Sequence, residues 1–85
     1  MTTALGGADA SITTQIQAAI LQSLPGSEVQ VTCGSPGHFA ISVRWGEFAN
    51  KNRLACQRLV YKAIAHLMAG DRAPVHAVDR LETSV

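Results

Sequence analysis

Two histidines and one cysteine are the side chains of this 85-residue chain with the clearest capacity for chemistry. They are Cys33, His38 and His76. A thiolate is a soft metal ligand, and a neutral imidazole binds iron, zinc or copper. Cys33 opens a run of turn-forming residues, 33–37, from which a ligand can reach out of a fold. His76 follows a proline and a valine at the start of an apolar run that indicates a strand.

Each of these residues also has a plain structural interpretation. His76 can be a strand residue that hydrogen-bonds a neighbour, and Cys33 can be an ordinary exposed thiol, since no cationic residue adjoins it. His38 alternates with Phe39, so it is expected on the solvent side of its strand. Cys56 falls on an apolar helix face and is predicted to be a core residue.

As a metal site this set is incomplete. Cys33, His38 and His76 supply at most three ligands, whereas a closed structural zinc site needs four, usually with C-x-x-C spacing. A site completed by thiolates of another molecule would make up the shortage. The sequence contains no nucleophile elbow, P-loop or dinucleotide fingerprint, and its six carboxylates are scattered, so we expect no enzymatic activity.

The residues that must position this site form five predicted elements. Ile12, Ile16, Ile20 and Leu24 recur every four residues and indicate a helix. Alternation predicts strands over 28–32 and 39–43, joined by a loop over 33–37, then a helix over 52–69 and a last strand over 75–83. The order predicts an α+β domain over residues 9–85, with a mixed three-stranded sheet covered by helices on one face, after a flexible arm over 1–8.

Charge and composition narrow the choice of compartment and partner. The first ten residues lack a basic region followed by an apolar run, and two unpaired cysteines do not make a disulfide framework, so a cytoplasmic protein away from membranes is expected. Residues 44–72 carry six cations against two carboxylates. The candidates for nucleic-acid contact are Lys51, Arg53, Arg58 and Lys62, although a basic helix surface is usually only solvated.

Several short runs resemble the BolA family of small KH-like domains. They are His38-Phe39, Phe48 through Lys51, Arg58-Leu59-Val60-Tyr61 and Val75-His76-Ala77, and their order and separation match the family over about residues 28–83. The resemblance implies a KH-like, class II-type fold. The chain departs from the family at Asn50 and Asn52 and at Cys56-Gln57-Arg58, where the family usually has Arg-His-Arg, and the change weakens a DNA-binding role.

The resemblance also implies a function. BolA-like proteins partner monothiol glutaredoxins and share a [2Fe-2S] cluster whose sulfur comes from the glutaredoxin cysteine and glutathione. The BolA side supplies a histidine from the last strand, matched by His76, and a second ligand from the hairpin loop, matched by Cys33 with His38 as competitor. We therefore expect an adaptor in iron-sulfur trafficking or in iron, redox or stress regulation, without a cofactor when isolated, as a monomer or weak homodimer.

Two rival functions remain. The first is a KH-like DNA-binding transcriptional regulator that works through the basic residues, although the segment 47–52 lacks the GXXG loop with which KH domains clamp a nucleic-acid backbone. The second is an interaction module that needs no metal.

Overall fold

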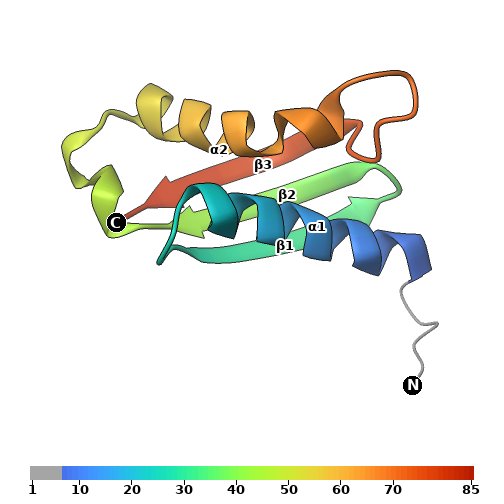
Figure 1. The fold of residues 1–85 in the computed structure, drawn as a ribbon, viewed down its shortest axis with the longest axis horizontal. Coiled ribbons are helices and arrows are strands. Elements are labelled where there is room, and N and C mark those ends of the chain that lie inside the picture. The colour runs from blue at the N-terminus through green and yellow to red at the C-terminus, as the bar shows by residue number, and fades with distance from the viewer. Residues whose placement is uncertain (1–6) are drawn as a thin grey trace.

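The computed structural model describes the backbone of residues 7–85 and the side chains of residues 11–85. Figure 1 shows the elements in chain order: α1 (Gly7–Ser23), β1 (Glu28–Ser35), β2 (His38–Arg44), the 3-10 helix η1 (Gly46–Asn50), α2 (Arg53–Met68) and β3 (Ala77–Ser84). The predicted order of helices and strands is confirmed. Of the predicted arm over 1–8, residues 1–6 lie outside the described part of the chain, while residues 7 and 8 already belong to α1.

The three strands form one mixed sheet in the order β1-β2-β3. β1 and β2 pair antiparallel as a hairpin, and β3 returns through α2 to lie parallel to β2. Both long helices lie on the same face of this sheet (Figure 1). Among residues 7–85, no helix covers the opposite face, so the predicted α+β architecture is confirmed.

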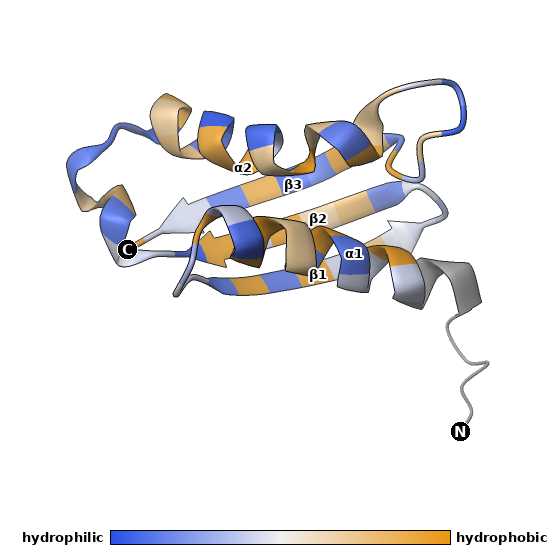
Figure 2. Ribbon diagram, in the orientation of Figure 1, coloured by the Kyte–Doolittle hydropathy of each residue, from blue (hydrophilic) through white to orange (hydrophobic). Residues whose placement is uncertain are grey.

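The hydrophobic core fills the space between the helices and the sheet. Phe39, Ile41 and Val43 alternate along β2 and are at most 2% exposed, because side chains two residues apart share one face of a strand. The two helices contribute fully buried residues to the same cluster: Ile16 and Ile20 from α1, Val60 and Ile64 from α2. Figure 2 shows that both helices carry apolar and hydrophilic residues in alternation along their length.

The hairpin is tighter than the sequence predicts. Residues 33–37 were expected to form a loop, but β1 continues through Cys33 to Ser35, and only Pro36 and Gly37 remain as the turn. A register shift between Cys33 and Ser35 lets the strand keep pairing up to the turn. Gly37 has a φ of +80°, a conformation that suits glycine and permits so short a connection.

The crossover helix α2 has defined ends. The side chain of Asn52 accepts a hydrogen bond of 2.8 Å from the Ala55 N–H, which satisfies one of the free donors of the first turn. After Met68 the chain leaves the helix, and Gly70 follows with a φ of +88°. The predicted span of 52–69 is therefore correct to within one residue at each end.

Replacing the cap of α2 should weaken the fold measurably. Asn52→Ala removes the acceptor for the Ala55 N–H, so we expect a loss of about 1 kcal/mol in the free energy of unfolding, measured in urea. Asn50→Ala is the matched control, since Asn50 is exposed at the end of η1 and does not cap α2. Equal losses in the two variants would contradict the assignment of the cap.

Candidate metal-binding end of the sheet

His76 lies beside the hairpin turn and is exposed to solvent. Its N–H donates to the Gly37 carbonyl oxygen at 2.9 Å, and the N–H of Ala77 donates to the same oxygen at 3.0 Å. The sequence predicts His76 within the last strand, but β3 begins one residue later, at Ala77. The histidine is therefore the residue that connects the start of β3 with the turn between β1 and β2, which Figure 1 shows at one end of the sheet.

The imidazole of His76 lies directly against Gly37. A Cβ atom built at Gly37 would be 2.6 Å from Nδ1 and 2.8 Å from Cγ of His76, distances that real Cβ atoms do not show. Gly37 itself is buried, although it forms a turn. The ring thus occupies the space that any other side chain at position 37 would need.

Cys33 lies near the same end but is less accessible than a loop residue. It pairs with Phe39, which places its side chain on the helix-covered face, where it packs at the margin of the core. The thiol is half-buried and donates to the Ser35 carbonyl oxygen at 3.1 Å. The prediction that Cys33 lies in a loop is wrong, because strand pairing continues past this residue.

His38 points to the other side of the sheet, as its alternation with Phe39 predicts. Its Nδ1 lies 3.1 Å from Oδ1 of Asp79, and both side chains are about half exposed. Asp79 occupies the register shift of β3, between the residues that pair with Phe39 and Ala40. A carboxylate on one ring nitrogen fixes the orientation of the ring and leaves the other nitrogen to face a metal ion.

Sequence reasoning did not identify Asp79. The only signal was its position three residues after His76, since nothing in the sequence predicts a bulge at that point of β3.

All three predicted donors thus lie at the hairpin end of the sheet, on different sides. Ser35 pairs with His38, and His38 pairs with Ala77, so the turn, β2 and the start of β3 adjoin there. Among the described side chains, those of residues 11–85, no group of three or more His, Cys, Asp or Glu converges in a way that could hold a metal ion.

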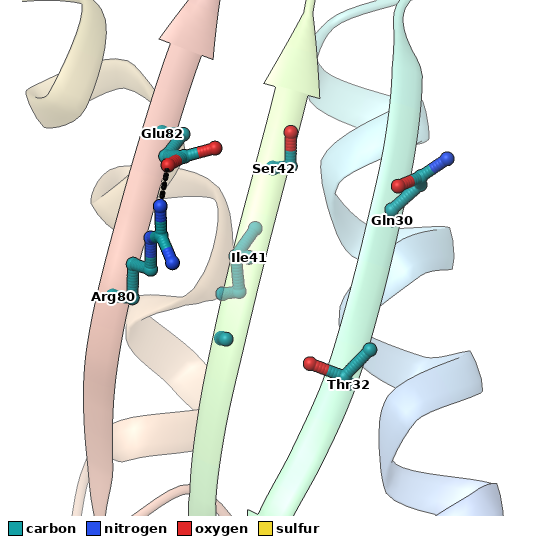
Figure 3. Close-up of a pocket in the computed structure, with 7 residues that line it drawn as sticks. Gln30, Thr32, Ile41, Ser42, Arg80 and Glu82 are labelled. Atoms are coloured by element: carbon teal, nitrogen blue, oxygen red, sulfur yellow. Dashed lines mark hydrogen bonds and ion pairs between the residues drawn. The ribbon is translucent and has the colours of Figure 1, made fainter.

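The face without helices offers a different kind of surface. Figure 3 looks onto it and shows an open hollow across all three strands, lined mainly by Gln30, Thr32, Ala40, Ser42, Arg80 and Glu82. The only carboxylate there, Glu82, is paired with Arg80 (Figure 3). This hollow has hydroxyl and amide groups but no thiol or imidazole, so it does not extend the candidate metal site.

The basic residues proposed for nucleic-acid contact are exposed, but they do not form one helical stripe. Lys51 precedes α2, and its Nζ donates to the Glu47 carbonyl oxygen at 3.2 Å. Arg53 begins α2, and Arg58 and Lys62 lie on its outer surface. α2 itself contains no carboxylate residue.

The place of a GXXG loop is taken by η1, whose Phe48 is buried with its ring 5.4 Å from that of Trp45, edge to face. A backbone-clamping loop is therefore replaced by a segment anchored in the core.

Sequence comparison agrees with this fold. The family model described as BolA-like protein matches residues 15–83, which is most of the chain and includes every candidate ligand. The chain belongs to the BolA family. No curated protein matches it closely in sequence. Among residues 7–85, no helix is long and apolar enough to cross a membrane.

Solved structures of BolA proteins share the fold. BolA1 from Arabidopsis thaliana superposes with a TM-score of 0.66 at 17% identity, over 85% of this chain and 89% of that one. The BolA domain of SufE1 from Arabidopsis thaliana gives 0.67 at 18% identity, over 86% and 92%. BolA1 from Mus musculus gives 0.65 at 25% identity, over 99% of this chain and 70% of that one.

The two thiols should differ in reactivity. Cys33 is half-buried beside the turn, whereas Cys56 is 4% exposed in the core, so iodoacetamide should modify Cys33 well before Cys56 in the native protein. Mass spectrometry of digested samples over time measures both rates. Denatured protein, in which both thiols are open, is the control. Equal native rates would show that Cys33 is no more available to a metal than a core residue.

Proposed function

We propose that this BolA protein is an adaptor that binds a monothiol glutaredoxin and shares a glutathione-dependent [2Fe-2S] cluster with it. The observation that supports this most directly is the position of His76. His76 is exposed and lies beside the hairpin turn, and its backbone is fixed there because its own N–H and that of Ala77 both donate to the Gly37 carbonyl oxygen. A ligand ring in that position is accessible to a partner and does not need the fold to open.

The donor chemistry fits a shared cluster. Imidazole and thiolate both bind iron, and the described chain offers two or three such donors at one end, which is too few for a site of its own. The missing ligands would be thiolates, one from the glutaredoxin and one from glutathione. Histidine ligation of one iron raises the reduction potential of a [2Fe-2S] cluster relative to ligation by four thiolates.

Two residues compete for the second ligand position. Cys33 is half-buried at the margin of the core, and the one hydrogen bond of its Sγ goes to a carbonyl oxygen of its own hairpin, which the thiol would give up to bind iron. His38 is held by Asp79 on the opposite side, with Nε2 as its remaining ring nitrogen. We assign Cys33 as the second ligand, because a thiolate is the softer donor.

Such an adaptor would act in iron-sulfur trafficking or in iron, redox or stress regulation, in the cytoplasm. A cluster held partly by imidazole should be retained longer than one held by thiolates alone, which suits a sensor or a late step of delivery. The isolated chain would carry no cluster and would be a monomer or weak homodimer.

Single substitutions at the three donors test the assignment. The protein and a monothiol glutaredoxin, purified together without oxygen and with glutathione, should form a brown heterodimer. His76→Ala and Cys33→Ser should each change its visible absorption and the EPR spectrum of the reduced cluster, because each removes a ligand from iron. His38→Ala is the matched control and should leave both spectra as in the wild type.

Two results would count against the proposal. If His76→Ala gives the wild-type spectra, the primary ligand is wrong. If His38→Ala changes the spectra and Cys33→Ser does not, the second ligand is His38, and the assignment of Cys33 is wrong.

The charge on α2 supports a second candidate function, a KH-like DNA-binding regulator. Arg58 and Lys62 project from a helix without any carboxylate, so this surface attracts phosphate. Against it stands η1, which replaces the loop that clamps a nucleic-acid backbone in KH domains.

If DNA is bound through α2, affinity should fall steeply with salt. Arg58→Ala and Lys62→Ala should each weaken binding uniformly across sequences and lower the salt slope by about 1, measured by gel retardation or fluorescence anisotropy. Arg44→Ala, a change at an exposed cation on the end of β2, is the control. Absence of binding by the wild-type protein at low salt would eliminate this function.

A further inference from the structure

We infer that Gly37 is the positioning residue for the His76 imidazole. An exposed histidine ordinarily samples several side-chain conformations, and a partner must restrict them on binding, which costs free energy. In this protein the ring lies against Gly37, where a methyl group would be 2.6 Å from Nδ1 and 2.8 Å from Cγ. The absence of a side chain at position 37 therefore determines where the ring can rest.

Backbone bonds fix the two residues relative to each other. The Gly37 carbonyl oxygen accepts from both His76 and Ala77, so neither the turn nor the start of β3 can move away without losing hydrogen bonds. A side chain at position 37 would leave these bonds in place and displace the ring, because Nδ1 and Cγ can turn about the Cα–Cβ bond whereas the backbone is held. The His76 Cβ, 3.2 Å from the built atom, would remain in tight contact.

The placement of the ring by Gly37 does not depend on the proposed function, but its consequence for cluster binding does. That Gly37 sets the ring position is a statement about the isolated chain. That the ring position matters for cluster binding requires His76 to be a ligand. The pre-positioned ring would lower the cost of forming the shared site, because the imidazole is already restricted before the partner arrives.

The chain contains a matched control for the strain that any substitution here introduces. Gly26 has a φ of +84°, close to the +80° of Gly37, but a Cβ built there meets nothing within 4 Å. Gly26→Ala and Gly37→Ala therefore introduce similar backbone strain. Only Gly37→Ala places a methyl group against the imidazole.

The first measurement uses the isolated protein. In wild type, NMR should show cross-relaxation between the Gly37 Hα protons and the ring protons of His76, and a ring-current shift of those Hα signals. Gly37→Ala should abolish the ring contact, while Gly26→Ala should retain it. Retention of the ring contact in Gly37→Ala would overturn the inference.

The second measurement uses the cluster-bound heterodimer with the glutaredoxin and glutathione. Gly37→Ala should alter the EPR spectrum and lose the cluster about tenfold faster than wild type, the size of effect seen when residues that orient a metal ligand are changed. Gly26→Ala should match wild type in both. A wild-type spectrum and lifetime in Gly37→Ala would show that Gly37 does not position the ligand.

Two further variants separate the possible failures. If Gly37→Ala does not fold, Gly37→Asn gives the same test, since Asn tolerates positive φ and also carries a Cβ. If the NMR contact behaves as expected but His76→Ala leaves the cluster spectra unchanged, the ring placement stands and the proposed ligand role fails.

Discussion

One carbonyl oxygen joins the two parts of the chain on which the candidate site depends. The oxygen of Gly37, at the hairpin turn, accepts hydrogen bonds from His76 and Ala77, which lie about forty residues further along the sequence. Between them the chain runs through β2, η1 and α2, and the apolar face of α2 packs on the sheet and returns β3 parallel to β2. Burial of the apolar faces of the helices thus drives the docking of β3 on the sheet. The hydrogen bonds at Gly37 define where β3 begins.

In this arrangement the residues that stabilise the fold and the candidate ligands occupy different parts of the domain. The core lies between the helices and the sheet, with Phe39 and Val43 fully buried, while the candidate ligands lie at one end of the sheet and contribute little to it. Residues at such an end can be exposed to a partner without unfolding the domain. Under the proposed function, two donors on one small chain would suffice for a shared site, since the partner would supply the rest of the coordination sphere.

The sequence predicted the fold best where the spacing of apolar residues shows which face of a helix or strand is buried. Ile16 and Ile20 in α1 and the alternation of Phe39, Ile41 and Val43 predicted the helix, the strand and the face that each buries. It was less informative at the hairpin. Cys33 looked like a loop residue because Gly34, Pro36 and Gly37 are turn formers, but a two-residue turn and a register shift keep it in β1. Composition does not distinguish a long loop from a bulged strand that ends in a tight turn.

The sequence proposes the members of the candidate site, and the structure adds their geometry. His76, Cys33 and His38 were proposed as metal ligands because histidine and cysteine bind metals. The resemblance to the BolA family then assigned them to one site. The contact between His76 and Gly37, and that between His38 and Asp79, depend on the register between strands distant in sequence. That register is set by packing of the whole sheet, so no local pattern encodes it.

The central claim is that His76 binds iron through an imidazole nitrogen. Hyperfine spectroscopy of the reduced heterodimer, with only this protein labelled with ¹⁵N-histidine, measures that bond directly. A strong ¹⁵N coupling that is lost in His76→Ala and kept in His38→Ala is the predicted result. Absence of a strong coupling in the wild-type complex, or its persistence in His76→Ala, would contradict the account.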